Sequence, residues 1–311
     1  MRIVIMGAGA IGSLFGGLLA EAGNEVSLIG RKPHVDKINQ EGLLIEGVSG
    51  KHQIQVAATA SPSTLEAPDL IILTVKAYDT AHAVEAVKPL FRAHTHFLCL
   101  QNGLGTEEVA GSILGNDRII RGTTSDGALF LEPGKIRHTG HGDTVFGYPD
   151  RAPDQFLKQL KEEFQKAGFN TTISDTIKKL VWQKIFVNVA INPFGTLTGL
   201  RNGELLTVPQ LKETMAAAVM EGIGVTDKLG LNIKKQMSID KAFEVARRTA
   251  MNKNSMLQDI EKGKRTEIDF INGALVKYGI EVGVSCPING VLTALVKGLE
   301  KRNELMSLEV N

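Results

Sequence analysis

Short apolar runs alternate with helical patterns through the first half of the chain. The runs cover residues 2–6, 25–29, 69–75, 97–100 and 118–124, and helical patterns follow at 10–22, at 80–91 and after the turn at 101–106. The run at 69–75 is typical of a parallel strand buried on both faces of a sheet. The alternation of strand and helix predicts an α/β domain with a parallel sheet.

Other patterns complete the chain. Residues 43–56 predict an irregular or β segment, and residues 125–149 show short alternating runs broken by glycines, which indicates antiparallel strands. A helix at 153–167 and a strand at 170–174 follow. From residue 176 onward helical periodicity dominates, with helices expected at 177–192, 208–229, 238–251, 254–262, 267–279 and 288–303. We therefore predict two domains, residues 1–175 and residues 176–311, the second all-α.

The first strand leads directly into a glycine-rich turn. Its residues are Gly7, Ala8, Gly9, Ala10, Ile11 and Gly12. In a strand–turn–helix unit the first glycine allows the tight turn, the second lets the backbone approach a pyrophosphate, and the third lets helix and strand pack closely. The N–H groups that begin the helix then face the phosphates. We interpret residues 1–175 as a Rossmann-type dinucleotide-binding domain; a turn without a ligand is the alternative.

The end of the second strand bears on the choice of cofactor. An NAD site usually carries an acidic residue there, which binds the ribose 2′-hydroxyl. The chain instead continues with Gly30, Arg31 and Lys32. Two cations and no acid favour a 2′-phosphate, so the sequence predicts NADPH as the cofactor. An ordinary pair of surface cations is the alternative.

Two polar residues stand at the ends of further strands. Lys76 follows the run at 69–75, and Asn102 follows the run at 97–100. In open α/β sheets ligands bind outside the carboxyl ends of the strands, which makes both residues candidates for the site. A solvated lysine and an Asn102-Gly103 turn dipeptide are the alternatives.

Residues 180–193 combine an apolar helix with a polar stripe. Lys184, Asn188 and Asn192 are spaced four apart and therefore share one helix face. Nearly all other residues there are apolar, and burying an ammonium and two carboxamides is costly unless polar groups face them. The stripe predicts a cleft wall that holds a polar ligand, and an interior stripe satisfied by protein groups is the alternative. Pro193 is expected to end or kink this helix.

Composition narrows the function classes. The 311 residues are 43% hydrophobic and 22% charged with a net charge of +1, which describes a soluble globular protein and argues against nucleic-acid or membrane-surface binding. No apolar run of 18 or more residues suggests a membrane span, no secretory-type segment precedes the first strand, and two cysteines make no disulfide framework. We therefore expect a cytoplasmic protein. The oligomeric state stays open, with a homodimer among the alternatives.

One segment contains residues of a kind that binds metals. His138 and His141 lie near Asp143 in the glycine-broken region. As metal ligands they lack convincing third and fourth partners, so we predict no metal site and interpret both histidines as structural or surface residues.

Seven segments match, in the same order, the motifs of one known family. They are residues 7–12, Lys76-Ala77, residues 102–106, Lys184 with Asn188 and Asn192-Pro193, residues 202–205, residues 255–259 and residues 266–273. The chain resembles 2-dehydropantoate 2-reductase (ketopantoate reductase) from end to end. The resemblance implies a Rossmann domain followed by a helical domain, with the active site between them. It also implies NADPH-dependent reduction of 2-dehydropantoate to (R)-pantoate, a step in pantothenate and coenzyme A synthesis.

The resemblance further implies roles for single residues. Lys184 would be the general acid and a substrate ligand, Asn102 would contact cofactor and substrate, and Arg31 would bind the 2′-phosphate. The other implied substrate ligands are Asn188, Asn192, Asn202 and Ser255, and the other implied cofactor-lining residues, besides residues 7–12, are Lys76, Ala128 and Glu267. Lys253-Asn254 differs from the pair found in some members, which leaves the contacts at 253 and 254 open.

The residues support part of this without the family. A 2-oxo acid needs an anion-tolerant pocket, a proton donor for its carbonyl oxygen and a hydride donor held in line, and the polar stripe and the dinucleotide fold supply candidates for each. Thr266-Glu267 is also an ordinary helix start. Two other functions remain open: another NADP-dependent 2-oxo acid or β-hydroxyacid-type dehydrogenase, and a non-catalytic NADPH sensor. A buried proton donor at Lys184 counts against the sensor.

Overall fold

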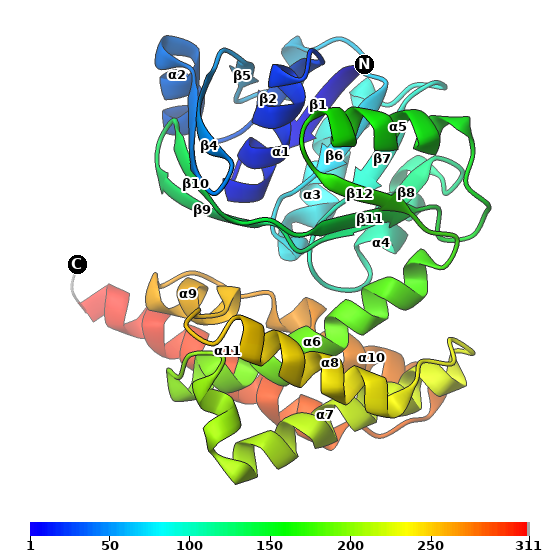
Figure 1. The fold of residues 1–311 in the computed structure, drawn as a ribbon, viewed down its shortest axis with the longest axis vertical. Coiled ribbons are helices and arrows are strands. Elements are labelled where there is room, and N and C mark those ends of the chain that lie inside the picture. The colour runs from blue at the N-terminus through cyan, green and yellow to red at the C-terminus, as the bar shows by residue number, and fades with distance from the viewer. Residues whose placement is uncertain (310–311) are drawn as a thin grey trace. The chain divides into compact units, whose positions relative to one another are not determined.

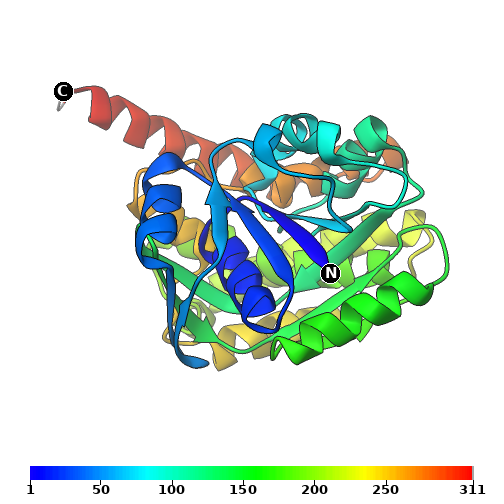
Figure 2. The same ribbon diagram turned by 90° about the horizontal axis from the view of Figure 1, so that it is seen from above.

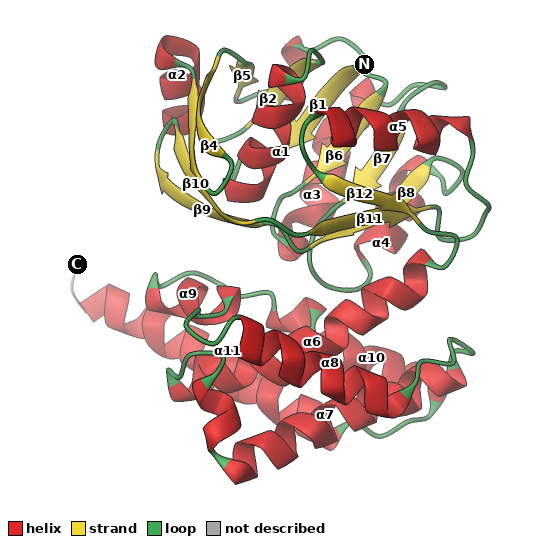
Figure 3. Ribbon diagram, viewed as in Figure 1, coloured by secondary structure: helices red, strands yellow, loops and turns green. Residues whose placement is uncertain are grey.

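The computed structural model describes residues 1–309 and divides into two compact units (Figure 1). The first unit consists of residues 1–101 and 106–178, and the second of residues 102–105 and the chain from residue 179 onward. The division falls just inside helix α6 (Ile177–Thr198), shortly after the boundary expected at residue 175. All strands within residues 1–309 lie in the first unit, and the second is helical (Figure 3). The predicted fold class, an α/β domain followed by an all-α domain, is confirmed.

An eight-stranded sheet forms the centre of the first unit. Its order is β12–β11–β8–β7–β6–β1–β2–β5. The bounds are β1 (Arg2–Met6), β2 (Glu25–Ile29), β5 (Ala57–Thr59), β6 (Leu70–Leu73), β7 (His96–Cys99), β8 (Ile119–Thr124), β11 (Asp143–Gly147) and β12 (Asn170–Ile173). The six strands from β8 to β5 pair in parallel, and β11 joins β8 antiparallel. The five apolar runs are therefore the parallel strands that the sequence predicts.

Helices cover both faces of this sheet. In β1, Ile3 and Ile5 pack in a core with α1 (Ala10–Glu21) and α5 (Gln155–Lys166), whereas Val4 packs in a second core with α3 (Thr80–Val87) and α4 (Thr106–Leu114). Figure 2 shows the two pairs of helices on opposite faces. Because both faces are buried, every position in these strands favours an apolar residue.

A second sheet of four strands lies against the outer side of α1. Its order is β4–β3–β10–β9, with bounds β3 (Leu43–Gly47), β4 (Gly50–Ile54), β9 (Gly127–Glu132) and β10 (Lys135–Gly140). The antiparallel pairing of β9 with β10 is as predicted for residues 125–149, but β10 also pairs in parallel with β3. This long-range pairing, and helix α2 (Lys32–Glu41) that precedes β3, were not predicted from the sequence.

Helix α1 fits between the two sheets because it carries glycines on both sides. A Cβ at Gly16 would lie 2.4 Å from Leu28 Cδ2 of the large sheet. A Cβ at Gly17 would lie 2.8 Å from Ile45 Cδ1 of the small sheet. Real Cβ atoms do not approach other heavy atoms this closely, so a larger residue at either position would push the helix off one sheet.

The second unit is built from helices. Besides α6 they are α7 (Pro209–Lys228), α8 (Lys235–Arg248), α9 (Ser255–Glu261), α10 (Asn272–Val282) and α11 (Pro287–Glu309). Helix α7 passes close to α6 and α10, since a Cβ at Gly222 would lie 2.6 Å from Phe186 Cε1 and 2.8 Å from Leu275 Cδ1. No helix within residues 1–309 is long and apolar enough to cross a membrane.

Two helix predictions in this unit need correction. Helix α6 does not end at Pro193 but continues to Thr198. The missing proline N–H costs one helical hydrogen bond, and burial of the residues beyond it, such as Phe194 at 4% exposure, offsets that cost. The helix expected at 267–279 begins only at Asn272, because Ile268–Phe270 form a separate 3-10 turn.

Candidate active site

The glycine turn after β1 has the geometry that its spacing predicts. Gly7 has a φ of +111°, and a Cβ there would lie 2.6 Å from the backbone N of Val75. A Cβ at Gly12 would lie 2.1 Å from Gly7 O and 2.5 Å from Thr74 Oγ1. Positive φ and close backbone contact both require glycine, so these two residues set the turn and the approach of α1 to the sheet.

Gly9 differs from its two neighbours in the motif. A Cβ built on it meets no atom within 4 Å. Gly9 is the N-cap of α1, and no side chain caps the helix there. The first N–H groups of a helix attract phosphate, and the open surface at Gly9 leaves room for a pyrophosphate to reach them. The arrangement therefore fits a dinucleotide.

The cations after β2 differ in their surroundings. Arg31 is the exposed N-cap residue of α2. Lys32 Nζ contacts Asp36 Oδ2 at 2.8 Å, in an ion pair along the same helix. Within residues 1–309, Arg31 has no such ion pair. Arg31 is therefore the better candidate for a 2′-phosphate.

Two other cofactor candidates belong to the first unit. Lys76 is half-buried and follows β6 of the large sheet, directly before a 3-10 turn at Ala77–Asp79. Ala128 is half-buried in β9 of the small sheet, where it pairs with His138. The two residues thus come from different sheets, which the sequence pattern alone does not reveal.

In the second unit Lys184 contacts Asn102, one of the predicted site residues. Lys184 Nζ donates a hydrogen bond to Asn102 Oδ1 at 2.8 Å. The loop that carries Asn102 is held by Leu104, whose N–H donates to Phe270 O at 2.9 Å. Gly103 has a φ of +98°, and a Cβ there would lie 2.8 Å from Phe270 Cβ. The glycine after Asn102 therefore has a backbone role, and it does not exclude a ligand role for Asn102 itself.

The polar stripe of α6 borders the packed side of that helix. Lys184 and Asn188 are half-buried, and Asn192 is 6% exposed. The residues next to them along the helix, such as Ile185 and Val189, are buried. The stripe is thus partly accessible at Lys184 and Asn188 and enclosed at Asn192. This arrangement fits the wall of a pocket that holds a polar ligand.

Three buried carboxamides in this unit, those of Asn202, Asn254 and Asn272, have an atom without a hydrogen-bond partner within residues 1–309. Asn202 is 6% exposed and donates to Thr249 Oγ1 at 2.8 Å, while its Oδ1 has no hydrogen-bond partner within residues 1–309. Asn254 is 8% exposed and caps α9 by accepting from Leu257 N at 3.0 Å, while its Nδ2 has no partner among the described residues. Buried polar atoms without partners are rare and mark sites where a ligand can bind.

Ser255, unlike its neighbour Asn254, is exposed. The family resemblance implied Ser255 as a substrate ligand and left the contacts at position 254 open. A Cβ at Gly195, near the end of α6, would lie 2.3 Å from Asn254 Nδ2, so this amide lies against the helix that carries the stripe. The signal for Asn254 in the sequence is an N-cap asparagine, which does not distinguish capping from ligand binding.

Glu267 had two interpretations from the sequence, as an acid in the first turn of a helix and as a residue that lines the cofactor. Thr266 Oγ1 accepts from Ile268 N at 3.2 Å and donates to Glu300 Oε1 at 2.6 Å, so the threonine does cap a turn. Glu267, however, is only 6% exposed. A solvated acid in the first turn of a helix would not be buried, and a buried carboxylate needs polar partners.

A buried ion pair braces the end of β7 and was missed by the sequence analysis. Arg121 Nε lies 3.1 Å from Glu107 Oε2, and both side chains are almost fully buried. Arg121 Nη1 donates to the carbonyl oxygens of Cys99, Gln101 and Gly122. The available signal was a cation in the middle of the apolar run at 118–124. This brace fixes the backbone that directly precedes Asn102.

These features define a class of protein. A parallel sheet with an open glycine turn suits a dinucleotide, and a lysine among carboxamides on a helical unit suits an oxyanion, so the class is that of dinucleotide-dependent oxidoreductases. Comparison with known families gives the particular group. Residues 3–151 match the model of ketopantoate reductase PanE/ApbA, and residues 176–300 match that of its C-terminal part. The chain belongs to the ketopantoate reductase PanE/ApbA family.

Relatives that align over the full length of the chain support the same family. The chain is 42% identical over 301 residues to 2-dehydropantoate 2-reductase of Pyrococcus horikoshii, covering 96% of this chain and 98% of that protein. It is 35% identical to the enzyme of the same name from Aquifex aeolicus, covering 97% and 98%. The predicted family and an oxidoreductase activity are confirmed.

Solved structures show the same fold over the whole chain. A PanE/ApbA family ketopantoate reductase from Ralstonia eutropha JMP134 superimposes with a TM-score of 0.90 at 32% identity, covering 98% of this chain and 100% of that one. A ternary complex of D-mandelate dehydrogenase with NADH and anilino(oxo)acetate gives a TM-score of 0.93 at 29% identity, with 98% and 100% covered. In that dehydrogenase the fold binds NADH, a nicotinamide dinucleotide.

Proposed function

We propose that this protein reduces 2-dehydropantoate to (R)-pantoate, with NADPH as the hydride donor and Lys184 as the proton donor. The observation that carries the proposal is the hydrogen bond from Lys184 Nζ to Asn102 Oδ1, on a helix that also presents Asn188 and Asn192. The names of the full-length relatives support the choice of substrate.

The chemistry divides between the two sets of residues. NADPH, when bound at the glycine turn, supplies the hydride that adds to C2 of the substrate. Lys184 stabilises the developing alkoxide through its positive charge and delivers the proton that completes the hydroxyl group. Asn102 accepts one of the three ammonium hydrogens and so orients the others.

The buried carboxamides suit the rest of the substrate. Asn202 Oδ1 is an acceptor without a partner within residues 1–309, and Asn254 Nδ2 is a donor without one. A hydroxyl group can donate to the first, and a carboxylate or hydroxyl oxygen can accept from the second. An unpaired buried group costs about 1–3 kcal/mol, so a ligand that pairs both is favoured over one that pairs neither.

The test of the proton donor is Lys184→Ala. Proton donation and oxyanion stabilisation together contribute about 3–6 kcal/mol, so kcat should fall by roughly two to four orders of magnitude. Lys179→Ala is the matched control, because Lys179 lies on the same helix and donates only to the backbone O of Asn232 among the contacts described. The Kd for NADPH should stay nearly unchanged in both variants. If Lys184→Ala keeps more than about a tenth of the wild-type turnover, the lysine is not the acid.

The preference for NADPH rests on Arg31. A charge-assisted hydrogen bond to the 2′-phosphate contributes about 1.5–3 kcal/mol, so Arg31→Ala should raise KM for NADPH roughly 10- to 150-fold and leave KM for NADH nearly unchanged. Lys32→Ala is the control, since Lys32 already pairs with Asp36. Equal use of NADPH and NADH by the unmutated protein would exclude the 2′-phosphate contact.

A second candidate substrate class comes from the ternary structure of D-mandelate dehydrogenase with NADH and anilino(oxo)acetate. Its TM-score of 0.93 makes another 2-oxo acid the specific alternative to 2-dehydropantoate. Rates of NADPH and NADH oxidation with 2-dehydropantoate, a straight-chain 2-oxo acid and an aromatic 2-oxo acid separate the two. A higher kcat/KM for the aromatic acid would favour the alternative. Tight NADPH binding without turnover of any 2-oxo acid would favour a sensor.

A further inference from the structure

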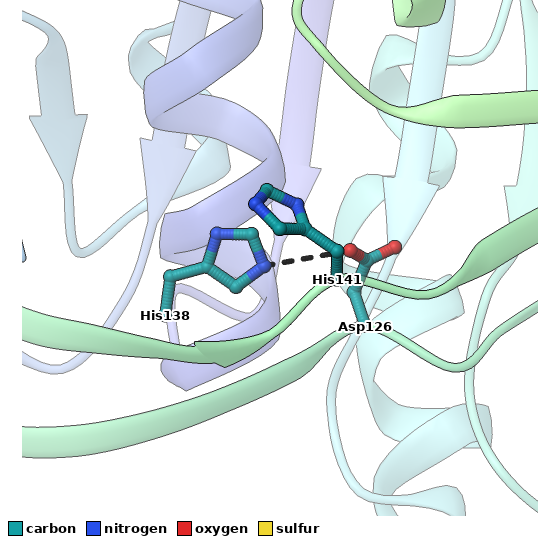
Figure 4. A group of neighbouring side chains, drawn as sticks. All are labelled: Asp126, His138 and His141. Carbon is teal, nitrogen blue, oxygen red and sulfur yellow. Dashed lines mark ion pairs between the residues drawn. The ribbon is translucent and has the colours of Figure 1, made fainter. Parts of the chain in front are cut away.

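A group of potential metal ligands lies in the first unit, where the chain passes from one sheet to the other. Asp126 connects β8 to β9, His138 lies on β10, and His141 lies between β10 and β11. One ligand-type atom from each residue lies within 4.8 Å of the other two (Figure 4). Asp143 is the acidic neighbour of the histidines in the sequence, whereas the structure brings Asp126 to them. The third partner that seemed to be missing is therefore present.

The two buried members of this group, His138 and Asp126, are separated by a distance typical of two ligands of one metal ion. His138 Nε2 lies 3.5 Å from Asp126 Oδ1, and these side chains are 1% and 2% exposed. Ligand bonds of 2.0–2.2 Å at tetrahedral angles separate two ligand atoms by about 3.4 Å. A cation can thus be held by both groups with little movement. His141 is exposed, so its ring can close on the cation from the solvent side.

The carboxylate is held in place by hydrogen bonds that leave it able to bind a cation. Asp126 Oδ2 accepts from Thr124 Oγ1 at 2.9 Å and from Thr144 Oγ1 at 3.3 Å, and Oδ1 accepts from Gly142 N at 3.2 Å. Such outer contacts are typical of carboxylates that bind metals, because they fix the orientation of the ligand. His138 Nε2 also lies 3.1 Å from Gly140 O, a hydrogen bond that a cation at Nε2 would replace while the imidazole carries its hydrogen on Nδ1.

We propose that Asp126, His138 and His141 bind one divalent transition-metal cation of the Zn²⁺ type, with water in the remaining position. Two imidazoles and one carboxylate favour Zn²⁺, Co²⁺, Ni²⁺ or Cu²⁺ over Mg²⁺ and Ca²⁺, which prefer oxygen ligands. The cation joins the β8–β9 connection to the β10–β11 connection, so binding stabilises the folded first unit. The proposal is independent of the substrate and of Lys184.

The test uses the full chain after treatment with a chelator. Titration with Co²⁺ followed by visible absorption, and equilibrium dialysis with Zn²⁺, should each give one bound cation per chain. His141→Ala should weaken binding at least about tenfold, because loss of even an outer contact of a metal ligand has this effect. His82→Ala is the matched control, since His82 is an exposed histidine on α3. Zn²⁺ should raise Tm in the wild-type protein and in His82→Ala, but not in His141→Ala.

Two results would overturn the proposal. One is the absence of stoichiometric binding at about 1 mM cation, a concentration at which even weak protein sites fill. The other is equal affinity in the wild-type protein and in His141→Ala. Asp126→Asn gives an independent check, because the amide keeps the size of the side chain and loses the charge. Unchanged binding in a folded Asp126→Asn variant would likewise show that the cation binds elsewhere.

Discussion

Replacing Arg121 by methionine should be among the most destabilising single changes in the first unit. Arg121 is 1% exposed and Glu107 is 7% exposed, with Nε and Oε2 3.1 Å apart. Methionine fills nearly the same space as the arginine side chain, but the positive charge that pairs with Glu107 is lost. Glu107 then stays buried as an uncompensated carboxylate.

The expected size follows from these contacts. Breaking one partner of a buried pair costs about 3–5 kcal/mol. Arg121 Nη1 also donates to three carbonyl oxygens at 2.8–3.0 Å, and these acceptors lose a charged donor as well. One nitrogen serves all three, so their contributions do not add, and we expect a loss near the upper end of that range. The exposed pair between Arg2 and Glu66 should contribute far less, because water screens its charges.

Urea unfolding measures both losses. Arg121→Met should lower the free energy of unfolding by about 3–5 kcal/mol, and Glu66→Gln, the control, should leave it nearly unchanged. The double variant Arg121→Met with Glu107→Leu should recover part of the loss, since no buried charge is then left alone. If Arg121→Met costs no more than Glu66→Gln, the buried pair does not stabilise the sheet.

The same variant tests the link to the site. Arg121 donates to Gln101 O, and Gln101 directly precedes Asn102, the hydrogen-bond partner of Lys184. Misplacement of Asn102 should lower kcat more than it raises KM for NADPH. Equal kcat in a folded Arg121→Met variant would show that the brace serves stability alone.

Burial lowers the pKa of His96 to about 4, whereas the pKa in the unfolded chain is near 6.5, so the unfolded state binds the proton more readily. The contribution of His96 to the free energy of unfolding should therefore be full above pH 6.5 and decrease as the pH falls towards 4. His96→Phe should flatten that fall in unfolding curves taken from pH 7 to pH 4, and an unchanged slope would contradict the role of burial. Gly12→Val should abolish tight NADPH binding and lower Tm, because its Cβ would lie 2.1 Å from Gly7 O; a wild-type Kd would count against this packing. Asn254→Ala should raise KM for 2-dehydropantoate more than Ser255→Ala does, since Asn254, unlike Ser255, is buried with a donor that has no partner within residues 1–309; the reverse order in steady-state kinetics would restore Ser255 as the main ligand.

Local sequence patterns predicted much of the fold. The apolar runs predicted the parallel strands because a strand buried on both faces favours apolar residues at most positions, as at Ile3, Val4 and Ile5. The glycine spacing predicted the tight turn between β1 and α1, because Gly7 and Gly12 meet backbone atoms that leave no space for a Cβ. The spacing of four between Lys184, Asn188 and Asn192 placed them on one face of α6, since helix geometry alone decides this.

Other features depend on partners far away in the sequence. The pairing of β10 with β3 joins segments whose local patterns say nothing of each other. The continuation of α6 past Pro193 depends on burial of the residues beyond it. A local pattern reports what a segment favours in isolation, and packing by distant segments can offset a proline that would otherwise end the helix.

The polar contacts of the site likewise depend on residues that are distant in the sequence. The sequence indicated that Lys184 needs a polar partner, and the tertiary structure supplied Asn102. It also paired Arg121 with Glu107 and brought Asp126, rather than Asp143, to His138. Residue types and spacing determine which groups require a partner, because burial of a charge or an amide is costly wherever it occurs. Only the folded chain decides which partner each group finds, because hydrogen bonds and ion pairs act over a few ångströms and the partners come from distant segments.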